Sequence, residues 1–178
     1  MAGYVALLRG VNVGGHRKVP MAELRELMAG LGWEGIRTHL QSGNAVFSAE
    51  GRSTEELAAE LERAVGRHFG FEVGCLVRTG EELRGAMERC PFPAAELDPA
   101  KLLVLFLSEP LDPVRLAPVD PAAYAPDEFQ LVRREIFCWF PGGMGRSKLP
   151  GALAGAAKGL TVTGRNWRTV STLAELVN

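Results

Sequence analysis

A Gly-rich loop near the N-terminus combines basic side chains with backbone freedom in a way that could bind an anion. Residues 10–18 read GVNVGGHRK, follow an apolar run and contain no acidic residue. A Gly-rich loop after a strand can hold a phosphate through its backbone N–H groups. The predicted ligand residues are Arg9 and Lys18 for charge, Asn12 for hydrogen bonding, and Gly14 and Gly15 as a backbone cradle.

This loop departs from both common nucleotide-binding motifs. Gly10 and Gly15 have the spacing of a P-loop, but His16 and Arg17 stand where Lys and then Ser or Thr are required. The dinucleotide fingerprint needs a glycine at position 12, which is Asn. Two interpretations remain open: an anion site, or a solvated connection whose glycines permit the turns.

A second basic loop lies near the C-terminus. Residues 142–149 read GGMGRSKL, so Arg146 and Lys148 flank Ser147 at the start of a predicted helix. Ser147 is a good N-cap, and an anion there would gain from free N–H groups and from the helix dipole. The alternative is that Ser147 caps the helix and that both cations are solvated.

Between Glu135 and Glu175 the chain has no acidic residue. This stretch adds Arg165 and Asn166 as ligand residues near the second loop, with Asn166 supplying hydrogen bonds, and either Asn166 or Thr163 could cap the last helix. The leading hypothesis is that the two basic loops converge on one cleft and bind a small anionic ligand, either phosphate-like or nucleotide-like. No cofactor or metal fingerprint is present, and no catalytic set is complete, so the sequence does not decide whether the protein is an enzyme.

The elements that would position the first loop follow a βαββαβ order. Ser53 and Glu56 have the spacing of a capping box before the second helix. This order is that of the ferredoxin-like fold, a four-stranded antiparallel sheet with both helices on one face. The predicted elements are a strand at 4–9, a helix at 20–30, strands at 36–40 and 45–47, a helix at 54–69 and a strand at 71–77.

The second half predicts a related α+β unit. Its strands are expected at 101–107, 129–132, 136–140 and 160–163, with a helix at 149–158 and a final helix from Trp167. Prolines at 91, 93 and 99 indicate a linker. The predicted fold is therefore α+β with a ferredoxin-like subdomain at 1–90, a linker at 91–100 and a second subdomain at 101–178.

The amino-acid composition limits which other functions fit the sequence. A net charge of −1 over 178 residues argues against nucleic acid as the main partner, and no apolar run could span a bilayer, so we expect a cytoplasmic protein. RNA binding on the sheet face would need exposed Tyr4 and Phe47. A phosphoryl-transfer enzyme with an acidic metal site and a module that pairs through an edge strand are further alternatives. The sequence does not indicate an oligomeric state.

Four segments carry a family resemblance: LLRGVNVGGHRKVPMAEL, LQSGNAVF, GMGRSKL and TGRNWRTVSTL. Together they resemble the bacterial family named domain of unknown function 1697, and they extend over nearly the whole chain. The resemblance implies an α+β fold of two subdomains and no assigned activity. His16-Arg17 stands where a Lys-Asn-like pair is common in that family, and Arg168 where Asn is common. Both departures leave the loops polar.

Overall fold

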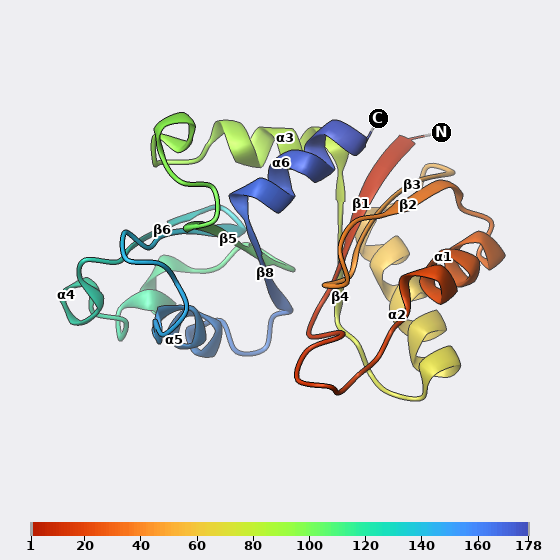
Figure 1. The fold of residues 1–178 in the computed structure, drawn as a ribbon, viewed down its shortest axis with the longest axis horizontal. Coiled ribbons are helices and arrows are strands. Elements are labelled where there is room, and N and C mark those ends of the chain that lie inside the picture. Colours follow the sequence, from red (N-terminus) through yellow and green to blue (C-terminus); the bar gives the residue numbers. More distant parts are fainter. Residues whose placement is uncertain (1, 178) are drawn as a thin grey trace. The chain divides into compact units, whose positions relative to one another are not determined.

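The computed structural model describes residues 2–177 and contains two four-stranded antiparallel sheets (Figure 1). The chain divides into two compact units: Met1–Gly85 with Thr172–Asn178, and Ala86–Ser171. The division passes through two helices, α3 (Gly80–Glu88) and α6 (Trp167–Leu176). It differs from the predicted ranges, which placed the C-terminal residues in the second subdomain; those ranges, and the linker at 91–100, stay predictions.

The first unit has the predicted ferredoxin-like βαββαβ order. Its sheet runs β2-β3-β1-β4, with all neighbours antiparallel. Helices α1 and α2 cover one face of this sheet (Figure 1). The elements are β1 (Ala2–Leu8), α1 (Met21–Gly30), β2 (Glu34–Thr38), β3 (Asn44–Ala49), α2 (Thr54–Phe69) and β4 (Cys75–Thr79).

Strand β1 lies at the centre of the first sheet because it pairs with β3 on one side and β4 on the other. Its residues Tyr4 to Leu8 are buried on both faces, as the continuous apolar run predicts. Leu24 of α1 and Leu57 of α2 are fully buried in the core beneath one face. The central strand therefore ends at a fixed point, from which the Gly-rich loop departs.

Local sequence signals set the helix ends. Ser53 and Glu56 form the predicted capping box at α2, with both hydrogen bonds present. The pair Thr79 and Glu82 forms the same arrangement where α3 begins. Gly70 closes α2 in the left-handed conformation, at φ 80°. These caps confirm that short polar motifs specify where the two helices start.

The second unit has the same strand arrangement as the first, β6-β7-β5-β8, and α5 packs on one face of its sheet. A pair of short helices stands where the first unit has α1. The elements are η1 (Ala94–Glu96), β5 (Leu102–Leu107), η2 (Pro113–Leu116), α4 (Pro121–Tyr124), β6 (Glu128–Val132), β7 (Glu135–Trp139), α5 (Leu149–Ala156) and β8 (Val162–Asn166).

Several elements begin or end at residues other than those that the sequence predicts. Strand β4 starts at Cys75 rather than at 71, because residues 71–74 form a loop that contacts the end of β1. The last strand runs over Val162–Asn166 rather than 160–163, since its pairing with β5 continues to Asn166. Helix α4 was not predicted; Asp120 caps it within a Pro-rich stretch.

Within residues 2–177, every helix is too short or too polar to cross a membrane.

Candidate functional site

Three loops meet at one end of the first sheet. They are the loop after β1 (residues 9–20), the turn between β2 and β3 (39–43) and the loop before β4 (70–74); we call this region the three-loop end. The backbone N–H of Leu8 donates to the carbonyl of Gly43 at 2.9 Å, and that of Arg9 donates to Gly74 at 2.8 Å. Both neighbouring loops are therefore tied to the point where the basic loop begins.

Asn12 fixes the shape of the basic loop. Its Nδ2 donates to the carbonyl oxygens of Val19, at 2.9 Å, and Gln41, at 2.6 Å, while its Oδ1 accepts from the N–H of Val19 at 2.9 Å. Its backbone is left-handed, at φ 57°, which Asn tolerates better than most residues. The polar atoms of this side chain are used within the protein, so Asn12 positions the loop rather than presenting a free donor.

Gly14 and Gly15 form the tip of a two-residue hairpin. Both have positive φ, 60° and 73°, the combination that a type I′ turn requires. The N–H of His16 donates to the carbonyl of Val13 at 3.1 Å, and that of Asn12 donates to Arg17 at 3.1 Å. The sequence predicted an irregular loop here, and the structure instead has a single antiparallel bridge between Val13 and His16. The role of these glycines as an anion cradle stays a prediction.

Close packing holds the hairpin against the neighbouring turn. Val11 and Val19 are almost fully buried and anchor the two ends of the loop in the core. A Cβ built on Gly43 would lie 2.8 Å from Leu8 Cβ and from Val11 Cγ2, so only glycine fits at this contact. The basic loop is thus held by packing as well as by the hydrogen bonds of Asn12.

The cations of the three-loop end are exposed. The side chains of Arg9 and Lys18 have no hydrogen bond or ion pair to another residue in the described part of the chain. The Arg17 guanidinium donates to the carbonyl of Glu72 and lies over the Phe71 ring, 5.8 Å from its centroid. Glu72 is the single acidic residue in the three loops, so positive charge exceeds negative charge at this end.

In the second basic loop, Ser147 bonds within the protein, whereas the sequence predicted that it binds a ligand. Ser147 Oγ donates to Asp127 Oδ2 at 2.9 Å and accepts from the N–H of Leu149 at 3.2 Å, at the start of α5. The serine hydroxyl therefore bonds to the first N–H of the helix, whose N-cap residue is Lys148, and a carboxylate lies against that hydroxyl. Arg146 and Lys148 are exposed on either side. An anion at Ser147 would be repelled by Asp127.

Arg165 and Asn166 also have structural partners. Arg165 is 8% exposed in β8, and its Nη1 donates to Thr163 Oγ1 at 2.7 Å and to the carbonyl of Gly164 at 2.9 Å. Burial lowers the pKa of Arg165 to about 10. Asn166 Oδ1 accepts from the N–H of Thr169 at 2.9 Å, as expected of a helix cap.

The ten predicted ligand residues lie in two different units. Residues 9–18 belong to the first unit and 146–166 to the second. The predicted convergence of the two loops stays a prediction.

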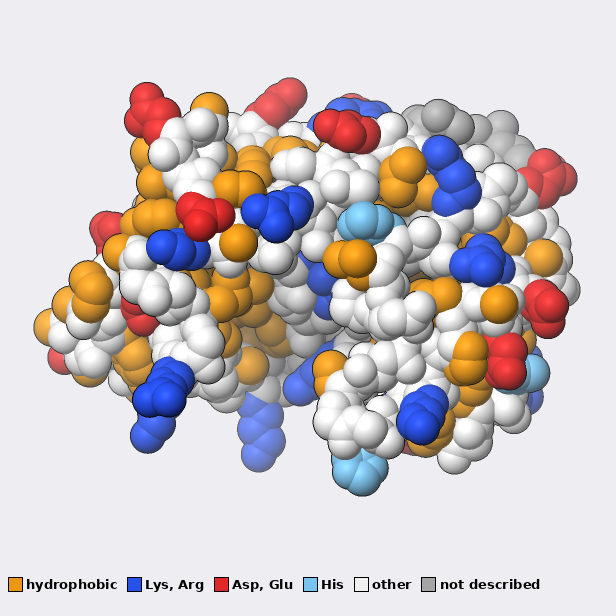
Figure 2. All heavy atoms as spheres, in the orientation of Figure 1, with side chains coloured by type: hydrophobic (Ala, Val, Ile, Leu, Met, Phe, Trp, Pro, Cys, Tyr) orange, Lys and Arg blue, Asp and Glu red, His pale blue; other side chains and the backbone are white. Residues whose placement is uncertain are grey.

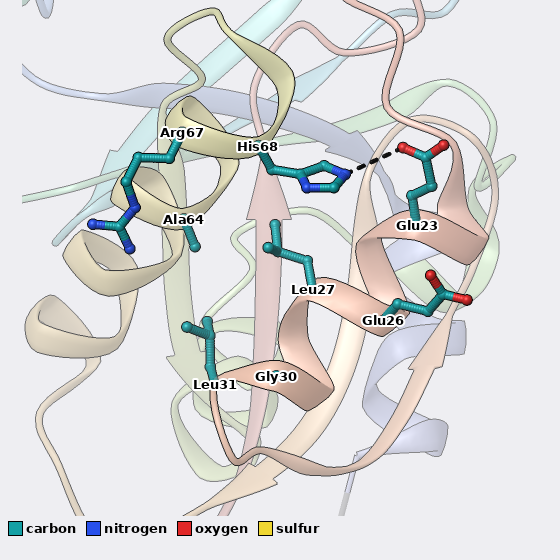
Figure 3. A pocket seen from close by; sticks show the side chains of 8 residues that line it. All are labelled: Glu23, Glu26, Leu27, Gly30, Leu31, Ala64, Arg67 and His68. Carbon is teal, nitrogen blue, oxygen red and sulfur yellow. Dashed lines mark ion pairs between the residues drawn. The ribbon is translucent and has the colours of Figure 1, made fainter.

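A groove between α1 and α2 was not identified from the sequence (Figure 3). It has a volume of about 500 Å³, and Leu27 projects from α1 towards α2 at its centre. His68 Nε2 and Glu23 Oε2 lie 3.4 Å apart across it. The spacing of Leu27 and Leu31 in the sequence is that of a helical core face, although both side chains are only partly buried. The remaining lining residues are Glu26, Gly30, Ala64 and Arg67.

The side chains that RNA binding would need on the sheet lie in the core instead. Tyr4 and Phe47 are 3% and 2% exposed and stack at 5.5 Å between ring centroids. Trp33 also stacks on Phe47, at 4.3 Å between ring centroids. Neither ring can stack on a base, so this pair cannot serve as the aromatic platform that RNA binding requires.

Among the described residues, no group of three or more His, Cys, Asp or Glu side chains could hold a metal ion.

Comparisons with known proteins agree with this architecture. The structure resembles that of a conserved bacterial protein from Streptococcus pneumoniae, with a TM-score of 0.78, 26% sequence identity and coverage of 98% of each chain. No curated protein matches the sequence. Residues 1–137 match the family described as protein of unknown function, DUF1697. That match includes all six elements from β1 to β4 and ends within the second predicted subdomain. The chain therefore belongs to the DUF1697 family.

Proposed function

We propose that the protein binds a small anionic ligand of the phosphate class at the three-loop end of its first unit. The observation that carries the proposal is the pair Arg9 and Lys18: both are exposed on a loop of fixed shape, and neither is paired with a carboxylate within the described residues. Around this loop, blue and pale blue side chains stand among white backbone and polar atoms (Figure 2).

Preorganisation supports this site over an ordinary solvated loop. The hydrogen bonds of Asn12 and the contact at Gly43 fix the backbone before any ligand arrives. A fixed loop loses less conformational entropy on binding than a flexible one. Arg17, bonded to the carbonyl of Glu72, adds a cation whose position is already set. An exposed site of this kind should bind weakly and lose affinity as salt screens its charges.

Whether the second basic loop contributes to ligand binding is a separate part of the proposal. Arg146 and Lys148 are exposed cations, but Ser147 between them is bonded to Asp127. If the two loops share one ligand, as the sequence predicts, removal of either cation set should weaken binding. If the first loop is sufficient, removal of Arg146 and Lys148 should leave binding unchanged.

A thermal-shift screen with inorganic phosphate, nucleotides and sugar phosphates, at matched ionic strength, tests the proposal. The melting temperature should rise with at least one phosphate compound and should rise less in Arg9→Ala and Lys18→Ala. Arg63→Ala is the matched control, since Arg63 is also exposed, lies in the same unit and is outside the three loops. Equal shifts in all of these variants, or no shift with any anion, would count against the site.

A further inference from the structure

The three-loop end presents aliphatic side chains beside its cations. Among the described residues, the exposed large hydrophobic side chains are Val13, Leu40 and Val114, at 57%, 56% and 68% exposure. Val13 lies at the hairpin tip and Leu40 in the neighbouring turn, so both belong to the three-loop end. Single exposed hydrophobic residues need no explanation, but two in adjacent loops beside a proposed anion site do.

The two loop tips are tied to each other. Asn12, which precedes Val13, donates to the carbonyl of Gln41, which follows Leu40, at 2.6 Å. Val11 packs against Gly43 from the other side of the same contact. The backbones that carry Val13 and Leu40 are therefore held in one place. In the space-filling view, separate orange side chains stand among the basic ones around this loop (Figure 2).

Leu40 is disfavoured at its position by two independent effects. Its backbone is left-handed, at φ 60°, a conformation that strains leucine and suits Gly or Asn. Its side chain is more than half exposed to water, which Asn would also tolerate better. Backbone strain of this kind persists where the surrounding structure fixes it, and it is found preferentially at binding sites.

From these observations we infer that the anion bound at the three-loop end carries an aliphatic chain, so that the ligand is an alkyl or acyl phosphate rather than a nucleotide. This inference rests on the proposed anion site. Val13 and Leu40 would contact the chain while Arg9 and Lys18 bind the charged group. Phe71 is the one Phe, Tyr or Trp in the three loops, and Arg17 already lies over one face of its ring, so a base would compete with Arg17 for that face.

A chain-length series tests this inference. We would measure the affinities of inorganic phosphate, butyl phosphate and octyl phosphate below its micelle concentration, together with AMP, by isothermal titration. Partial burial of the longer chain should make octyl phosphate bind about tenfold more tightly than inorganic phosphate. AMP should bind no more tightly than inorganic phosphate. A nucleotide that binds more tightly than octyl phosphate would overturn the inference.

Two variants locate the chain, and a third serves as control. Val13→Thr replaces a methyl group by a hydroxyl on an exposed side chain, and Leu40→Asn suits the left-handed backbone, so neither should unfold the protein. Both should reduce the advantage of octyl phosphate while leaving the affinity for inorganic phosphate unchanged. Val114→Thr, an exposed hydrophobic position in the second unit, should change neither affinity. A chain-length effect that survives in both site variants would overturn the inference.

The failures of the two proposals are distinguishable. Phosphate binding without any chain-length effect would refute the aliphatic ligand and leave the anion site standing. If no phosphate compound binds, both fail. If octyl phosphate binds equally well in Arg9→Ala and Lys18→Ala, it adsorbs through its chain alone, which also refutes both.

An aliphatic phosphate could be a free metabolite or a lipid in a bilayer. Sedimentation with phosphatidylglycerol vesicles, compared with phosphatidylcholine vesicles, separates these sources. Sedimentation with the anionic vesicles that is lost in Leu40→Asn would support a lipid, and binding confined to monomeric octyl phosphate would support a free compound.

Discussion

The side-chain amide of Asn12 donates a hydrogen bond of 2.6 Å to the carbonyl oxygen of Gln41. Through this bond a residue that follows β1 holds the turn between β2 and β3. The same amide group also exchanges two hydrogen bonds with the backbone of Val19. Asn12 is therefore the residue that gives the basic loop its fixed shape, on which the proposed anion site depends.

Replacement of Asn12 by Ala should destabilise the protein. The variant loses three hydrogen bonds and places Ala in a left-handed conformation, so the free energy of unfolding should fall by about 2–4 kcal/mol. Asn12→Gly loses the same bonds without the backbone strain, and its loss should be smaller by about 1 kcal/mol. Urea denaturation of both variants measures the difference. A loss below about 0.5 kcal/mol in Asn12→Ala would show that the bonds contribute little.

Gly43→Ala should cost more than an alanine at another left-handed glycine. Its new Cβ would lie 2.8 Å from Leu8 Cβ and Val11 Cγ2, and the backbone at φ 89° is itself unfavourable for Ala. Gly32, at φ 86° with nothing within 4 Å, provides the matched control. Urea denaturation should show that Gly43→Ala loses about 1–3 kcal/mol more than Gly32→Ala. Equal losses would mean that the turn can move away from β1.

Removal of the Ser147 hydroxyl should weaken the start of α5. Ser147→Ala loses both the cap on Leu149 and the hydrogen bond to Asp127, and about 1–2 kcal/mol of unfolding free energy should be lost. Asp127→Asn keeps an acceptor oxygen for the serine and should cost less. Thermal or urea denaturation compares the two. If Asp127→Asn were the more damaging change, the carboxylate would have another essential partner.

Stability should fall as the pH rises above 9, in part because of Cys138. This thiol is fully buried in β7; burial, and secondarily the charge of Asp127, raise its pKa from 9.0 to about 12. Between these values the unfolded chain loses the proton while the folded protein keeps it, so alkaline pH favours unfolding. Urea denaturation at pH 7 to 10 should show a shallower decline in Cys138→Ala than in the parent. An identical decline would assign the effect to other groups.

Much of the fold could be predicted from sequence because the decisive signals are local. The Ser53 and Glu56 capping box gave the start of α2, and the apolar run after Tyr4 indicated a central strand. The start of β4 was misplaced because Phe71 has high strand propensity, whereas a long-range contact between Arg9 and Gly74 makes this segment a loop. Such tertiary contacts leave no periodic pattern in the sequence.

The candidate site was less predictable than the fold. Residue types identified the exposed cations Arg9 and Lys18, but they also suggested that Asn12 and Ser147 were ligands. The structure shows that both of these side chains bond to their own chain. An Asn or Ser in a polar loop has the same composition signal whether it binds a ligand or holds the backbone. Its partners depend on which distant carbonyl or amide the fold brings near.

The most direct test of the anion site is a phosphate titration followed by ¹H–¹⁵N NMR of the backbone amides. The account predicts that chemical-shift changes concentrate in residues 9–18, 39–43 and 70–74 and nearly vanish when Arg9 and Lys18 are both replaced by Ala. Changes centred instead on the groove between α1 and α2, around Glu23 and His68, or the same pattern in the double variant, would contradict it.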